Sequence, residues 1–426
     1  MKTLGWSVLS LLVAPIVCAQ APRNTATPAQ QKISWAEGSI KARPDHSQPY
    51  NDLAVAYVQR VRETADTGYY DQAETVLQKS FEITPDNLEG QKARLMILLG
   101  RGEFGQALGL AKALNKKTPD DVLLYGFIAD AAIGLGDYGD AEEAAQWMLD
   151  MRPGNVPALL RGAALRRLYG DARGAKDFFA QAYQQMAPTQ TEERAWTLTQ
   201  MADLQRSIGD LAGAEKLLHS ALQQFPGYYA ALEESARVQT MRQRYSEAVD
   251  LLHQRSLKLP TAASRYALAQ ALERSGQTTE ARLAYADFAA TARPLISASD
   301  NANEELISYY LDREHNPAEA LRIAQLEITR RHDVNTLDAY AWALFGNERY
   351  EEAQKQIAIS LAVGVREARM FYHAGVIAAK LHDDRSAARY LNQSLELDRS
   401  SESAAAVREA LQNLAPESAA IARGDK

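Results

Sequence analysis

The chain has 426 residues, of which 46% are hydrophobic and 24% charged, and its formal net charge is −7. This composition excludes wholesale disorder, since the chain has enough apolar side chains to build a core. Lysine and arginine are mixed with aspartate and glutamate along the length, so no basic stripe indicates a nucleic acid partner.

Residues 1–19 are predicted to be a signal peptide. Lys2 precedes an apolar run from Leu4 to Val17, and Val17-Cys18-Ala19 fits the exit of a signal peptidase site, so cleavage is expected after Ala19. The run is shorter than the ~20 residues that span a bilayer, and no later stretch reaches that length without a charge. The sequence therefore predicts an exported protein, periplasmic or extracellular, with no transmembrane segment.

Cys18 is the only cysteine and lies inside the predicted signal peptide, so the mature chain would hold no disulfide. The absence of cysteine is typical of proteins of a bacterial envelope or extracellular compartment. A lipoprotein, with Cys18 as its lipidated first residue, is the alternative. The preceding Pro15-Ile16-Val17 disfavours it, because lipidation sites require small residues there.

Residues 20–32 have no hydrophobic periodicity, and structure is expected from near Ile33. The whole segment before the repeat array, residues 20–48, is nevertheless assigned to a flexible leader. A regular pattern follows, in which proline recurs every 34 residues within two sets, at Pro85, Pro119 and Pro153 and at Pro226, Pro260 and Pro294. A fixed period of this length is the signature of a repeat array.

Each period carries the same signals at fixed offsets, as in Gly102-Glu-Phe104 with Ala107, and Gly136-Asp-Tyr138 with Ala141. The glycine is expected to end the first helix in a left-handed cap, and the alanine to let the second helix approach its neighbour. The pattern closely resembles the tetratricopeptide repeat. The resemblance implies an all-α fold, a right-handed superhelical α-solenoid of about ten helix-turn-helix repeats over residues 49–400.

The two ends of the array depart from the pattern. Tyr57 and Gly68 are eleven residues apart where the family has four, so the first helix of the first repeat should be long, or broken near Thr67. The last three units lose the terminal proline, and the final pair resembles a unit of secreted bacterial tetratricopeptide proteins. Residues 401–414 are predicted to form a capping helix, followed by a frayed tail over residues 415–426.

No motif in the chain indicates catalysis, a metal or a cofactor. Two stretches, 100–105 and 134–139, match G-x-G-x-x-G, but both fall in the turn between two helices of a repeat and lack a preceding strand. The seven histidines are dispersed without the spacing of a helical zinc site, and no nucleophile motif is present. We therefore predict a protein that is not an enzyme.

In the family, side chains of each first helix line the concave groove where partners dock. Transferring those positions to this chain predicts a groove of mixed charge and aromatic character. Besides Arg167, it is predicted to contain Asp203, Arg206, Glu233, Arg237, Tyr266, Gln270, Glu273, Tyr309, Asp312, Asp338, Trp342 and Tyr372.

Three functions remain open from the sequence. The first is a non-enzymatic scaffold of the bacterial cell envelope that binds another protein or peptide in the groove. The second is an accessory protein that guides an exported polysaccharide, with Tyr266, Tyr309 and Trp342 stacking on sugar rings. The third is a hydrolase, which would require a cleft of converging carboxylates and histidines.

Overall fold

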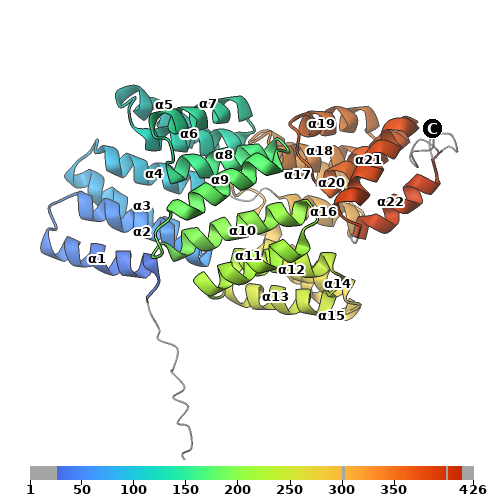
Figure 1. Cartoon of the computed structure of the whole chain (residues 1–426), viewed down its shortest axis with the longest axis horizontal. Helices are drawn as coiled ribbons and strands as arrows, with labels where there is room; N and C mark the ends of the chain where they lie inside the picture. Colours follow the sequence, from blue (N-terminus) through green and yellow to red (C-terminus); the bar gives the residue numbers. More distant parts are fainter. Residues whose placement is uncertain (1–25, 300–302, 400–401, 415–426) are drawn as a thin grey trace, which may run out of the picture.

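The computed structural model describes residues 26–299, 303–399 and 402–414. Within these ranges the chain forms 22 α-helices, one 3-10 helix (η1, Arg293–Leu295) and no strand (Figure 1). The predicted signal peptide with Cys18, the first residues of the predicted leader, and the predicted tail lie outside the described residues. The all-α prediction is confirmed for the part of the chain that the structure describes.

Twenty of the helices form ten successive antiparallel hairpins, as predicted, and they stack into a right-handed α-solenoid (Figure 1). We number these hairpins as repeats one to ten. They are α2 (Gln48–Thr64) with α3 (Gly68–Ile83), α4 (Leu88–Gly100) with α5 (Phe104–Lys117), α6 (Val122–Leu135) with α7 (Tyr138–Met151), α8 (Val156–Leu168) with α9 (Ala172–Gln185), α10 (Thr191–Ser207) with α11 (Leu211–Gln224), α12 (Tyr229–Met241) with α13 (Tyr245–Lys258), α14 (Ala262–Arg274) with α15 (Thr278–Ala292), α16 (Glu304–Asp312) with α17 (Pro317–Ile328), α18 (Val334–Gly346) with α19 (Tyr350–Ala362), and α20 (Ala368–Lys380) with α21 (Asp384–Leu397).

The turn of each hairpin has the predicted backbone. Gly102 and Gly136 adopt positive φ, and the alanines that follow in the second helices, Ala107 and Ala141, are fully buried. The two G-x-G-x-x-G stretches span such turns, since α4 ends at Gly100 and α5 begins at Phe104. Their glycines thus shape the hairpins, and the strand that a dinucleotide site requires is absent from this part of the chain.

Helix α1 (Pro28–Ala42) corrects the prediction of a flexible leader over residues 20–48. Thr27 and Gln30 form a capping box at its start, and Ala29 and Ala36 are fully buried against the array. The backbone N–H of Ala29 donates to the Glu63 carboxylate of α2 at 2.8 Å. The hydrophobic pattern of α1 indicates a helix only weakly, because the two residues that it buries are both alanines.

The first repeat has the long first helix that its spacing predicted. Helix α2 has 17 residues against 13 in α4, and Ala65 ends it in the left-handed conformation. At the other end of the array, α22 (Glu402–Gln412) packs on α20 and α21, where Val407 is fully buried.

The solenoid returns onto itself, so that repeats three and four contact repeats nine and ten. The backbone N–H of His332 donates to the Leu135 carbonyl at 2.8 Å, and that of Val334 donates to the Tyr138 hydroxyl at 2.9 Å. A Cβ added to Gly170 would lie 2.6 Å from the Gly364 carbonyl oxygen. We call this contact between turns of the superhelix the seam.

A second contact between distant repeats joins α2 to α10, the first helices of repeats one and five. Arg62 lies 2.8 Å from the carboxylate of Glu192, which is fully buried, and the Tyr228 hydroxyl donates to Glu192 at 3.0 Å. The N-terminal part of the inner surface is therefore occupied by the chain's own contacts. The open part of the inner surface begins at repeat four.

The buried Glu192 predicts a pH dependence of stability. Burial raises its pKa from 4.5 to about 7, although Arg62 opposes the shift. Because the folded state then binds the proton more tightly than the unfolded state, this carboxyl favours folding below about pH 4.5, and the contribution is lost as pH rises through about 7. We expect Glu192→Gln to flatten the fall in melting temperature between pH 5 and pH 8. Equal slopes in the variant and the unmodified chain would contradict this assignment.

Candidate central cavity

A cavity of about 770 Å³ lies on the inner side of repeats four to ten. Its walls come from the first helices of all seven repeats, α8, α10, α12, α14, α16, α18 and α20, and one end reaches Ala406 of α22. The volume falls within the range of ~300–1,000 Å³ that ligand-binding pockets have. Because the seam closes the superhelix beside it, this part of the predicted groove is a partly enclosed cavity that stays open to solvent.

A ladder of alternating charges runs along one wall, from α8 through α10 and α12 to α13. Arg167 contacts Asp203 at 2.9 Å, Asp203 also pairs with Arg206, and Arg206 reaches Glu234 at 2.5 Å. The ladder continues through Arg237 to Glu233, which Arg255 of α13 contacts at 2.7 Å. Every charge of the ladder thus has a partner of opposite sign in the folded chain.

Pairing with arginine offsets the cost of burying the carboxylates of the ladder, fully for Asp203 and in part for Glu234. Burial alone would raise the pKa of the Asp203 carboxyl, but Arg167 and Arg206 together hold that pKa below its ordinary value. For Glu234, with 3% of its surface exposed, Arg206 and Arg237 favour the charged form too, but burial outweighs them and raises its pKa above the ordinary value. The ladder is therefore stable only while its arginines are present.

A second charge cluster faces the ladder from α16, α18 and α20. Arg369 contacts Asp338 at 3.2 Å and Glu304 at 3.5 Å, and Asp338 also pairs with His373 at 2.7 Å. Asp338 is fully buried; burial tends to raise its pKa, yet His373 and Arg369 hold that pKa below its ordinary value. Glu304 lies deep in the molecule and is open only to the cavity, so burial raises its pKa to about 7.

Arg167 and nine of the other twelve side chains predicted for the groove line this cavity. The nine are Asp203, Arg206, Glu233, Arg237, Tyr266, Gln270, Asp312, Trp342 and Tyr372. The period of the repeat places them correctly, because each first helix presents the same face to the inside.

The other three predicted residues lie elsewhere. Glu273 bonds to the Tyr285 hydroxyl and to Arg313, away from the cavity lining. Asp338 is buried beneath the wall, where it orients His373. Tyr309 is 8% exposed, and its hydroxyl donates to Glu314 at 2.8 Å. These three side chains stabilise the repeats and do not reach a ligand in the cavity.

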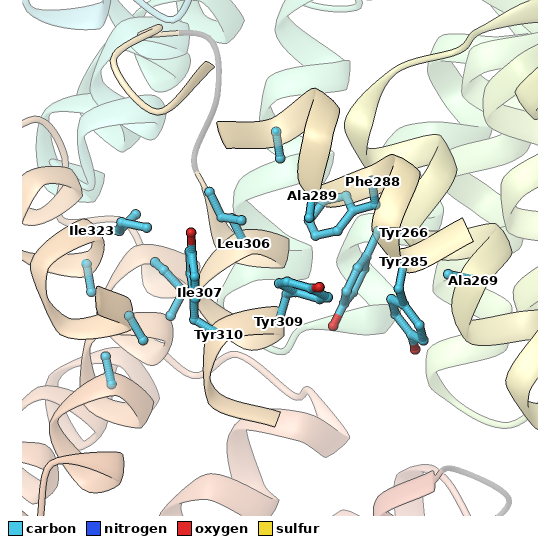
Figure 2. Close-up of a cluster of buried hydrophobic side chains, with 14 residues drawn as sticks. Tyr266, Ala269, Tyr285, Phe288, Ala289, Leu306, Ile307, Tyr309, Tyr310 and Ile323 are labelled. Atoms are coloured by element: carbon cyan, nitrogen blue, oxygen red, sulfur yellow. The ribbon is translucent and has the colours of Figure 1, made fainter. Parts of the chain in front are cut away.

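The aromatic rings predicted to stack on sugars are already packed. Figure 2 shows Tyr266 and Tyr309 in the cluster of Tyr285 and Phe288, in which Tyr266 and Phe288 have ring centroids 4.8 Å apart. The Trp342 indole lies parallel to two rings, Phe345 at 4.8 Å and His373 at 4.1 Å. Tyr309 is therefore part of the core, whereas Tyr266 and Trp342 pack against other rings and keep one edge in the cavity lining.

Seven charged residues of the lining were not predicted, namely Arg274, Glu304, Glu305, Arg366, Glu367, Arg369 and Asp398. The transfer of positions took no residue at or just before the start of α16 or α20, where Glu304, Glu305, Arg366, Glu367 and Arg369 lie. A usable signal was present, since Val365-Arg366-Glu367 occupies a place where earlier repeats have proline.

The cavity does bring carboxylates and one histidine together, the condition set for a hydrolase, but it lacks a nucleophile pair. The His373 ring forms a hydrogen bond with the Asp338 carboxylate. No serine or threonine hydroxyl in the described ranges bonds to the ring. Nor do three potential metal ligands cluster anywhere in these ranges. No helix among the described residues is long and apolar enough to cross a membrane.

Sequence profiles described as tetratricopeptide repeat match residues 92–156 and 207–272. These segments span parts of repeats two to seven, all of which except repeat six have glycine at the turn. The chain carries tetratricopeptide repeats. A search of curated protein sequences finds no match.

Among solved structures, two of human IFIT1 dimers are similar to this tetratricopeptide array. The dimer with PPP-AAAA has 13% identity and a TM-score of 0.50, covering 86% of this chain and 85% of that one. The dimer with m7Gppp-AAAA has 14% identity and a TM-score of 0.51, covering 86% and 84%.

The Cut9-Hcn1 hetero-tetramer of APC/C has 14% identity and a TM-score of 0.47, covering 81% of this chain. The present chain spans 58% of the length of that matched chain. At these identities the likeness shows the shared solenoid fold alone.

Proposed function

We propose that this chain is a non-enzymatic scaffold of the bacterial cell envelope that holds a segment of a protein partner in the central cavity. The observation that carries the proposal is the cavity itself. Arg237 and Arg369 lie deep in the molecule, yet 56% and 48% of their side-chain surfaces remain open to it. Charged groups held this way are available to a ligand that enters the cavity.

The charge balance of the lining favours a peptide over a nucleic acid. Six arginines and seven carboxylates face the cavity, and four of the arginines pair with carboxylates of the chain itself. A phosphate backbone gains affinity from basic side chains that are free to replace its counterions. A peptide carries both signs and backbone hydrogen-bonding groups, which suit a lining of paired charges with Gln270 and Ser308 among them.

The envelope address is supported by the N-terminal sequence. A basic residue, an apolar run and the Val17-Cys18-Ala19 exit are the features of a secretory signal. Mass spectrometry of the chain recovered from its own host tests this directly. A mature N-terminus at Gln20 is expected in the envelope fraction, and a full-length chain found only in the cytoplasm would contradict the address.

The binding role is tested by filling the cavity. We expect Gln270→Trp to abolish recovery of the crosslinked protein partner, because the indole would occupy space in the cavity wall. Gln223→Trp is the matched control, since Gln223 is exposed on α11 outside the cavity. Equal recovery of the same partner by both variants, with both folded by circular dichroism, would show that the partner binds elsewhere.

A further inference from the structure

A second, smaller cavity adjoins the central one at the seam. Its volume is about 240 Å³, and most of its lining is apolar, including Phe179, Trp196 and Ile208 from repeats four and five. Val334 and Val365 line it from the opposite side of the seam. We call it the seam pocket. It lies below the usual range of pockets for whole ligands, and its size suits a single bulky side chain.

The seam pocket has an unused apolar surface. Ile208, at its edge, is 58% exposed, although it is the residue that directly follows α10. Exposed large apolar side chains beside a concave apolar surface are typical of places where another molecule packs. The pocket therefore has both the shape and the surface to receive an apolar group.

Arg366 stands where the two cavities meet. It lines both of them, together with Arg167 and Glu367. Its aliphatic stem runs along Gly170, within 3.7 Å of where a Cβ of that glycine would lie. Arg167 is paired with Asp203 at 2.9 Å, whereas Arg366 makes no ion pair with any residue in the described ranges. An exposed, unpaired guanidinium beside an apolar pocket favours a ligand that carries a carboxylate next to its apolar group.

We propose that the seam pocket binds a bulky apolar side chain of the partner segment, while an acidic residue beside it pairs with Arg366. This inference rests on the proposed function and names the chemistry of the segment. Because the pocket has walls on both sides of the seam, the bound side chain joins repeats four and five to repeats nine and ten. Binding there stabilises the closed superhelix.

The probe is a positional-scanning library of hexapeptides, acetylated and amidated so that only side chains carry charge, with the purified full chain as bait. The unmodified chain is expected to enrich Asp or Glu next to Leu, Phe, Met or Trp. Arg366→Gln should reduce the enrichment of the acid at least fivefold and keep that of the apolar residue. Ala164→Phe, which fills the pocket from α8, should remove the apolar preference.

Two exposed positions outside both cavities supply the controls. Arg173→Gln and Ala212→Phe lie on second helices and should leave the enriched sequences unchanged. Bound peptide should also slow hydrogen exchange at the amides of His332 and Val334, which bond across the seam. A structural role of Arg366 alone would not change the acid preference.

The outcomes separate this inference from the proposed function. If the enriched peptides lack the acid–apolar pair, the seam pocket is not the subsite. The same holds if the pair is enriched but neither Arg366→Gln nor Ala164→Phe alters it. If such peptides are still lost in Gln270→Trp, the central cavity remains the binding site. Retention of no peptide by the unmodified chain would count against both.

Discussion

Gly136→Ala is expected to destabilise the protein well beyond the ordinary cost of its backbone conformation. Gly136 has a φ of +89°, and an alanine in that region costs about 1 kcal/mol. A Cβ there would also lie 2.5 Å from the carbonyl carbon of His332, far inside contact distance. The atoms of His332 that the Cβ would meet belong to its backbone and cannot rotate away, so the seam must open or shift. We expect this to lower the unfolding free energy by a further ~1–3 kcal/mol.

Two glycines elsewhere in the array serve as controls, because they separate the effect of the clash at the seam from the effect of backbone strain. Gly209 and Gly276 have φ values of +84° and +81° at the same hairpin position, and a Cβ at either meets no atom within 4 Å. Alanine at these sites should cost only the backbone term. Hydrogen exchange provides the second measurement, since the amides of His332 and Val334 should exchange faster in Gly136→Ala alone. Similar free energies and exchange rates in all three variants would refute the role of the seam.

The hairpin and the seam show what the sequence could and could not predict. The recurrence of glycine and alanine predicted the left-handed turn at Gly136, because that turn is a local property of the chain. The same glycine also leaves room for His332, almost 200 residues later, and no local pattern records this approach. The period predicts which face points inward, but the number of repeats per superhelical turn depends on small packing angles summed over many helices.

Turns without glycine illustrate how tertiary packing overrides local preference. Gln243, Glu348 and His382 adopt positive φ at the hairpin position where other repeats have glycine. Each of these turns is held by its two packed helices, which outweigh the strain of one residue. In two of these repeats an aromatic residue, Tyr245 or Tyr350, still follows the turn, so the repeat pattern stays recognisable without the glycine.

The sequence predicts which side chains of the candidate site point inward, but not which of them contact one another. Inward positions of the first helices were correct for Arg167 and nine other residues, since a helical period places them on one face. Trp342 was predicted as an open ring, yet His373, on the next first helix, lies against it at 4.1 Å. Contacts between neighbouring repeats of this kind depend on side-chain conformations that the period does not determine.

Arg206→Ala is expected to be among the most destabilising single changes in the chain. It removes the cation between Asp203 and Glu234, which are 8% and 3% exposed, and a buried pair broken on one side costs about 3–5 kcal/mol. We expect about 3 kcal/mol in urea unfolding, because Arg167 and Arg237 each keep a contact with one of the two carboxylates.

The surface pair of Arg322 and Glu319 supplies the comparison for this loss. The Arg322 side chain is 55% exposed, so Arg322→Ala should change the unfolding free energy by less than about 0.5 kcal/mol. Combining Arg206→Met with Asp203→Asn and Glu234→Gln should recover most of the stability, because no buried charge is then left unpaired. A triple variant no more stable than Arg206→Ala would mean that Arg206 acts through the packing of its stem. Recovery would identify the alternating charges as the feature that holds the wall of the cavity in place.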